Sequence, residues 1–167
     1  MIWRDDDILQ DAHGLDELLR VDDLFQASGR KHTIAVIASR MTPELAAAIR
    51  DRGMRAQLHC WNHDDLSVNA EAVDQLPMAL EAIEDAVGVR PTVLYPPWNR
   101  TSPMLEAAAA ALGLVVSAVK ISLEQFIRVQ GRVSESTINF HYWHQPDVDL
   151  LEEAFHWDRD ARLAGFR

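Results

Sequence analysis

Strand-type and helix-type hydrophobic patterns alternate along the whole chain. Apolar and β-branched runs predict six strands, over residues 1–7, 32–39, 54–59, 90–100, 114–121 and 136–143. Apolar residues spaced three and four apart predict helices over residues 15–29, 42–53, 74–88, 102–113 and 147–166. The pairs Thr42-Pro43 and Ser102-Pro103 are typical of a helix N-cap followed by proline in the first turn.

This regular alternation predicts an α/β fold in which helices connect mainly parallel strands and cover them from outside. The sheet could be open or curled toward a barrel. With 167 residues, the chain is shorter than the roughly 250 residues of an eight-fold barrel. We therefore expect a distorted or incomplete (β/α) barrel, and a single domain over residues 1–167.

Charge and cysteine content narrow the expected partners and compartment. A net charge of -10 argues against nucleic acids and anionic membranes, which bind through clustered lysine and arginine. No apolar run reaches the roughly 20 residues needed to span a bilayer. Cys60 is the single cysteine, and no signal peptide pattern is seen, so a cytoplasmic location is expected. A neutral or cationic small molecule or a glycan is an easier partner, and a homo-oligomer is compatible with the sequence.

Polar side chains that can bind metals follow several of the predicted strands. In parallel folds of this type, functional residues gather where the strands end. The residues concerned are Asp5, Asp6 and Asp7 at the end of the first strand, His59 at the end of the third with His63 a turn later, Pro96 to Asn99 at the end of the fourth, and His141 and His144 at the end of the sixth. We expect the fold to bring these groups to one rim of the sheet.

The residue types at this rim favour a metal site. An HxxxH pair alone is also common in surface or capping roles, but two imidazoles and a carboxylate suit Zn²⁺, Fe²⁺, Co²⁺ or Mn²⁺. Such a site, in the zinc case, supports hydrolysis of an amide or ester. A second carboxylate can then take a proton from water, and a histidine can protonate the leaving group. Asp6 or Asp7 and His141 are suited to these roles.

Four motifs, WRDDD, HCWNH, YPPWNR and NFHYWH, occur in this order at the predicted strand ends. Together they resemble the polysaccharide deacetylase family of the NodB-homology type, and the resemblance extends over most of the chain. That family consists of metal-dependent enzymes on a distorted (β/α) barrel, which remove N- or O-acetyl groups from glycans. The resemblance implies the same fold, a divalent metal, most often zinc, and a glycan or small N-acetylated substrate.

The resemblance also implies roles for individual residues. Asp6 would be the general base and His141 the general acid, and Asp7, His59 and His63 would hold the metal. An assignment one residue earlier, with Asp5 as base and Asp6 as ligand, stays open. His144 is the alternative to His141 as the acid. Residues expected at the substrate are Trp61, Pro97, Trp98 and Asn99, because an indole suits the flat apolar face of a sugar.

This chain departs from the family pattern at two positions. Tyr95 stands where the family has an arginine that orients the base, and Arg4 or Arg100 could replace that arginine. The glycine that usually follows the aspartate pair is absent. Three classes of function therefore remain: a metal-dependent deacetylase acting on non-peptide C–N bonds, a catalytically degenerate binding module of the same fold, and an iron-dependent oxygenase with two histidines and one carboxylate.

Overall fold

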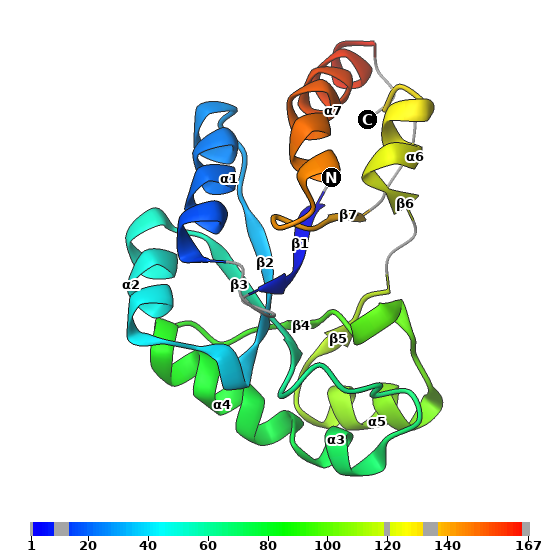
Figure 1. Ribbon diagram of the computed structural model, residues 1–167. Coiled ribbons are helices and arrows are strands. Elements are labelled where there is room, and N and C mark those ends of the chain that lie inside the picture. The colour runs from blue at the N-terminus through cyan, green and yellow to red at the C-terminus, as the bar shows by residue number, and fades with distance from the viewer. Residues whose placement is uncertain (1, 9–13, 119–120, 132–136, 165–167) are drawn as a thin grey trace.

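Seven strands form one sheet in the computed structural model, which describes residues 2–8, 14–118, 121–131 and 137–164. The order across the sheet is β5-β4-β3-β2-β1-β7-β6, and the pairings of its neighbouring strands are all parallel. The strands are β1 (Ile2–Ile8), β2 (Thr33–Ile37), β3 (Arg55–Cys60), β4 (Val93–Leu94), β5 (Val115–Val116), β6 (Ile121–Ser122) and β7 (Thr137–Phe140). Figure 1 shows the helices arranged around the sheet.

Most connections between the strands contain a helix, as the alternating pattern predicted. The α-helices are α1 (Leu15–Ala27), α2 (Pro43–Arg52), α3 (Ala70–Asp74), α4 (Leu76–Val87), α5 (Pro103–Ala111), α6 (Leu123–Arg128) and α7 (Gln145–Leu163), with short 3₁₀ turns η1 (Ala38–Arg40) and η2 (Pro97–Asn99). The two expected N-caps are confirmed, since Thr42 and Ser102 accept hydrogen bonds from backbone amides three residues later. Helix α4 ends at Val87, and the C-cap residue Gly88 adopts a left-handed φ of 76°.

The single strand predicted over residues 114–121 is wrong, because this segment belongs to both edges of the sheet. Its first part forms β5, which pairs with β4, and its last part forms β6, which pairs with β7. Five Cα steps, from residue 116 to residue 121, connect the two edges, and steps of about 3.8 Å allow a separation of at most about 19 Å. Seven strands in a flat sheet would be wider than this, so the sheet must curl. The prediction of an incomplete, distorted barrel is confirmed.

Helix α6 was not predicted, although the sequence contains a signal for it. The Ser122 hydroxyl accepts a hydrogen bond from the Gln125 amide at 3.2 Å, and the Gln125 side chain accepts one from the Ser122 amide at 3.1 Å. This reciprocal pair is a capping box, which satisfies two amides at a helix start. Leu123 and Phe126 are the buried residues of the short helix.

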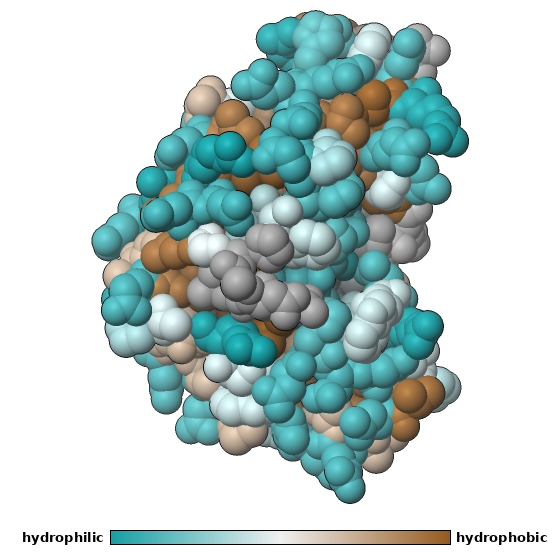
Figure 2. Space-filling view, in the orientation of Figure 1, coloured by the Kyte–Doolittle hydropathy of each residue, from teal (hydrophilic) through white to brown (hydrophobic). Residues whose placement is uncertain are grey.

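Apolar side chains fill the space between the sheet and the helices. Trp3 on β1, for example, packs edge-on against Phe126 of α6 and Phe155 of α7, with ring centroids 5.5 and 4.8 Å apart. Figure 2 shows hydrophilic residues over most of one face of the molecule, with hydrophobic residues in small separate patches. Among the described residues, no helix is both long and apolar enough to cross a membrane.

A polar cluster lies inside this largely apolar layer. The His32 ring, just before β2, has Nε2 at 3.2 Å from Asp5 Oδ2 and Nδ1 at 3.2 Å from Asp22 Oδ1. It also stacks on Phe25 of α1, with a centroid separation of 4.4 Å. Burial by itself would lower the pKa of His32, but the two carboxylates raise it above its usual value. Burial raises the pKa of Asp5 to about 6, although its contacts with His32 oppose the change.

These pKa directions predict how the cluster stabilises the fold at different pH. A raised pKa means that protonated His32 stabilises the folded state fully below its unfolded pKa of about 6.5, and that this contribution is lost as pH rises through the folded pKa. Removing the ring in His32→Gln should therefore lower the free energy of unfolding most near pH 6.5 and less toward pH 9. Urea unfolding of both proteins across this range measures the difference. A difference in unfolding free energy that stays constant or grows with pH contradicts the prediction.

Candidate metal centre and catalytic site

Asp7, His59 and His63 converge at the carboxyl ends of β1 and β3. One potential ligand atom from each residue lies within 4.8 Å of the other two. The Nε2 atoms of both histidines are 2.9 Å from Oδ1 of Asp7. Burial by itself would raise the pKa of Asp7, but the two imidazoles hold it well below its usual range, so Asp7 is ionised at neutral pH.

The contacts of the His59 ring indicate that this cluster suits a cation. Nδ1 of His59 lies 2.5 Å from the carbonyl oxygen of Tyr95, so Nδ1 carries the proton and donates it to that carbonyl. In the neutral ring this tautomer would direct the lone pair of the buried Nε2 at Oδ1 of Asp7, 2.9 Å away. A lone pair facing a carboxylate in a buried place is unfavourable unless a positive charge, either a proton or a metal ion, lies between them. Two imidazoles and one carboxylate are also a common ligand set for zinc.

Left-handed backbone conformations are concentrated around the same cluster. Four of the five non-glycine residues with positive φ in the described ranges lie here: Asp7 at 59°, His63 at 66°, Trp98 at 52° and Asn99 at 56°. Such conformations cost energy for residues with a Cβ, and they occur preferentially at functional sites. Cys60 helps to hold one of them, because its Sγ accepts a hydrogen bond from the His63 amide at 2.9 Å. Burial raises the pKa of the Cys60 thiol, so this sulfur stays protonated.

Asp6 directly precedes Asp7, and the two oxygens of its carboxylate have different surroundings. Its Oδ2 accepts hydrogen bonds from Arg4 and, at 2.6 Å, from Nδ2 of Asn139 on β7. Its Oδ1 is buried and has no hydrogen-bond partner among the described residues. Oδ1 is therefore the oxygen of Asp6 that is left to accept a hydrogen bond from a further group.

The arginine beside Asp6 is Arg4, and not Arg100. Arg4 is fully buried, and its guanidinium carbon lies 4.4 Å from the centre of the Tyr95 ring. Its Nη2 also donates to Oδ1 of Asn99 at 2.7 Å. Arg100 instead forms an exposed ion pair with Asp65 at 2.7 Å. The guanidinium thus reaches Asp6 from β1, and the Tyr95 ring packs against it.

His141 faces the cluster from the end of β7. Its Nε2 lies 3.6 Å from Oδ2 of Asp7, and its Nδ1 lies 3.6 Å from Oδ2 of Asp147 on α7. Burial by itself would lower the pKa of His141, but Asp147 and the charges of Asp6, Asp7 and Asp5 raise it. His144 contacts the other oxygen of Asp147 at 3.0 Å, and its side chain is about half exposed. Of the two candidate acids, His141 is therefore the one directed toward Asp7.

The predicted substrate residues differ in their accessibility. Trp98 is 54% exposed, and its ring centroid lies 4.7 Å from that of His63. Pro97 is buried, and Trp61 is half-buried against the core. Asn99 contacts Arg4 within the site. Among these four residues, Trp98 is the one whose side chain lies largely open to a ligand.

A family model described as polysaccharide deacetylase matches residues 15–117. The chain belongs to the polysaccharide deacetylase family. The match confirms the resemblance found in the motifs, and it includes His59, His63 and the Pro-Pro pair. Asp6, Asp7 and His141 lie outside the matched range, so their placement in this family member comes from the geometry described above.

Solved structures of family 4 carbohydrate esterases share this fold at low sequence identity. One, from Streptomyces lividans in complex with acetate, is 18% identical with a TM-score of 0.80, and the match covers 94% of this chain and 86% of that one. An acetyl xylan esterase from Clostridium thermocellum with a cobalt ion is 20% identical (TM-score 0.74; 96% and 83% covered). A mutant with restored activity of a Bacillus anthracis pseudoenzyme is 15% identical with a TM-score of 0.83. That match covers 96% of the present chain and 62% of the pseudoenzyme chain.

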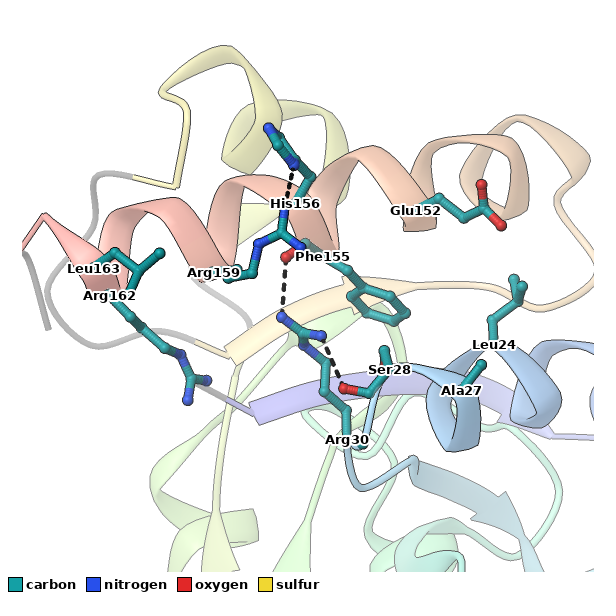
Figure 3. Close-up of a pocket in the computed structure, with 11 residues that line it drawn as sticks. Leu24, Ala27, Ser28, Arg30, Glu152, Phe155, His156, Arg159, Arg162 and Leu163 are labelled. Carbon is teal, nitrogen blue, oxygen red and sulfur yellow. Dashed lines mark hydrogen bonds between the residues drawn. The ribbon is translucent and has the colours of Figure 1, made fainter.

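One pocket of this deacetylase family member lies away from the Asp7, His59 and His63 cluster. It has a volume of about 730 Å³ and lies between the end of α1 and the second half of α7. Figure 3 shows Arg30 at its centre, bonded to the carbonyl oxygens of Ser28 and Phe155. Residues 28–30 precede the amino end of β2, whereas Asp7 and His59 lie near the carboxyl ends of β1 and β3. The pocket is therefore at the opposite end of the parallel sheet.

Two residues of the site were missed by the reading of the sequence. Asn139, which bonds Asp6, lies two residues before His141, and strand alternation places such residues on the same side of β7. Asp147, in the first turn of α7, accepts a hydrogen bond from the His141 amide at 3.0 Å. Its sequence signal was ambiguous, because an acidic residue in a first turn is also typical of helix stabilisation.

The buried Arg4–Asp6 pair gives a prediction for stability. Arg4→Met leaves a buried carboxylate without its main partner, and should reduce the free energy of unfolding by roughly 3–5 kcal/mol. Adding Asp6→Asn should recover part of this loss. Urea unfolding of the two single variants and the double variant measures the coupling. Arg100→Met is the control, because its exposed ion pair should be worth about 1 kcal/mol or less. Strictly additive effects of Arg4→Met and Asp6→Asn contradict the prediction.

Proposed function

We propose that this protein is a metal-dependent hydrolase that removes an acetyl or related acyl group from an N-acetylated carbohydrate. The observation that carries the proposal is the arrangement around Asp7. Asp7, His59 and His63 form a cation site, Asp6 presents a free oxygen beside it, and His141 faces it. Membership of the deacetylase family favours hydrolysis over the oxygenase alternative.

A divalent ion fits the ligand set, with Asp7, His59 and His63 as its protein ligands. Zinc is the first choice, and cobalt, manganese and iron accept the same donors. The cobalt ion in the related acetyl xylan esterase supports a divalent metal in this proposal. When bound, such an ion polarises an acyl oxygen and makes water more acidic.

The protein's own groups would handle the two proton transfers. Asp6 Oδ1 accepts the proton of the attacking water, because Arg4 and Asn139 hold Oδ2 and so fix the carboxylate plane. His141 donates a proton from Nε2 to the leaving nitrogen, while Asp147 orients the ring from the Nδ1 side. Cleavage of an amide needs both transfers, since the nitrogen leaves readily as a neutral amine and not as an anion.

The exposed Trp98 supports a carbohydrate substrate. Its indole lies against His63, and an apolar sugar face can stack on it while the acyl group approaches Asp7. One related carbohydrate esterase is in complex with acetate and another is an acetyl xylan esterase, which is consistent with removal of acetyl groups from a carbohydrate.

A binding module without catalysis is the second candidate, favoured by Tyr95 in place of the family's arginine and by the pseudoenzyme of the same fold. The contact of Arg4 with Asp6 argues against it, because this guanidinium supplies the positive charge next to the base.

The metal assignment predicts a zinc-binding defect in His63→Ala. The wild type should bind about one zinc ion per chain, measured by calorimetry and elemental analysis. Loss of a direct ligand should weaken binding by more than the roughly 10–100-fold typical of outer partners. His156→Ala, an exposed histidine on α7, is the control and should bind like the wild type. Unchanged stoichiometry and affinity in His63→Ala would remove the assignment.

The assigned proton transfers predict variants that keep zinc and lose turnover. Asp6→Asn and His141→Ala should each reduce acetate release from N-acetylglucosamine oligomers by roughly 10²–10⁴-fold. Zinc affinity should change little, because neither residue belongs to the Asp7 cluster. His144→Ala tests the alternative acid and should retain most activity. Near-normal turnover in either of the first two variants contradicts its role, whereas zinc binding without any turnover in the wild type favours the binding module.

A further inference from the structure

A line of buried polar groups leads from the surface of α2 to the loop that carries His141. Arg52, about one third exposed, donates to Oδ2 of fully buried Asp22 at 3.3 Å. Asp22 Oδ1 lies 3.2 Å from one nitrogen of His32, and the other nitrogen lies 3.2 Å from Oδ2 of Asp5. Oδ1 of Asp5 then accepts a hydrogen bond from the Tyr142 amide at 2.9 Å. The base and the metal ligands of the proposed mechanism do not use this line.

The last contact matters because Tyr142 follows His141 directly. Strand β7 ends at Phe140, so the amides of residues 141 and 142 lie beyond its pairing with β1. Each donates to a carboxylate instead: His141 to Asp147 at 3.0 Å, and Tyr142 to Asp5 at 2.9 Å. Two carboxylates from different elements thus fix two consecutive peptide units, and with them the Cα–Cβ direction of His141.

The position of the Asp5 carboxylate depends on His32, which contacts it directly, and on Asp22, which contacts the other side of the His32 ring. Its side chain is completely buried, and a carboxylate in such a place needs both charge compensation and hydrogen bonds. His32 supplies both, and its stacking on Phe25 fixes the plane of the ring. Each member therefore restricts the next, from α1 through His32 to β1.

We propose that Asp5, held by His32 and Asp22, is a positioning residue that fixes the His141 loop so that Nε2 of His141 faces the reacting acyl group. The proposal deepens the proposed function and rests on it for the role of His141. A small displacement of His141 would impair protonation of the leaving group without affecting the metal ligands, since misplacement by about 1 Å can cost up to roughly 100-fold in rate.

Two substrates separate this role from a general loss of structure. N-acetylglucosamine oligomers release an amine that needs a proton, whereas 4-nitrophenyl acetate releases a phenolate that needs none. In the zinc-loaded full chain, Asp5→Ala should lower kcat on the oligomers by roughly 10–100-fold, with KM changed less than about threefold. Its turnover of 4-nitrophenyl acetate should stay within about threefold of the wild type. Asp5→Asn keeps a side-chain oxygen for the Tyr142 amide and should restore most of the loss.

A matched control uses another buried aspartate. Asp158 on α7 is fully buried and pairs with Arg30, and it lies about three turns along the helix from Asp147, the residue that contacts His141. Any loss in Asp158→Ala should be equal for both substrates. An equal loss for both substrates in Asp5→Ala overturns the proposal, as does failure of Asp5→Asn to restore activity. If Asp5→Ala does not fold, His32→Gln takes its place and should show the same unequal loss in smaller measure.

Hydrogen exchange tests the proposal independently of turnover. The Tyr142 amide should exchange slowly in the wild type and in Asp5→Asn, and much faster in Asp5→Ala or His32→Gln, while the amides of β2 keep their protection. Unchanged exchange at Tyr142 overturns the positioning role even if the enzyme is active. If the zinc-loaded wild type hydrolyses neither substrate, the proposed function fails, and the exchange result still decides whether Asp5 fixes this loop.

Discussion

Three consecutive buried aspartates near the end of a central strand impose the main constraint on this structure. Side chains alternate along β1, so Asp5 and Asp6 point to opposite faces of the sheet and need different partners. Asp5 meets His32 on the side of α1, and Asp6 meets Arg4, which lies two residues away on its own face. The positive φ of Asp7 breaks the alternation and turns it toward two histidines. Because an unpaired buried carboxylate is costly, each must have its partner for the fold to persist.

Curling of the sheet brings the proposed catalytic groups together. The strand ends of β1, β3 and β7 supply Asp7, His59 and His141, which are far apart in the sequence but converge because the strands are parallel. The Nε2 atom of His141 lies 3.6 Å from the carboxylate of Asp7, and Asp6 directly precedes Asp7 in β1. The proposed proton acceptor and proton donor are thus both associated with the proposed metal ligand Asp7.

Partner groups outside the site keep this geometry rigid. The Tyr95 carbonyl fixes the His59 ring, Asn139 and Arg4 fix Asp6, and Asp147 contacts His141 at both the ring and the backbone. Strained backbone at Asp7 and His63 persists because such contacts surround it. Stability and catalytic geometry therefore depend on the same buried polar groups, and one substitution, such as Arg4→Met, should affect both.

Local patterns in the sequence determined the alternation of strands and helices, the caps at Thr42 and Ser102, and the candidate residues at the strand ends. These features depend on neighbours within a few positions, so they can be read from one chain. The choice of Arg4 over Arg100, the tautomer of His59 and the pairing of Asp5 with His32 and Tyr142 could not be read in this way. The division of residues 114–121 between two sheet edges was also hidden, since an apolar run does not reveal which strand it pairs with. Only the tertiary structure decides these contacts, because they join residues distant in sequence whose approach depends on the curl of the sheet.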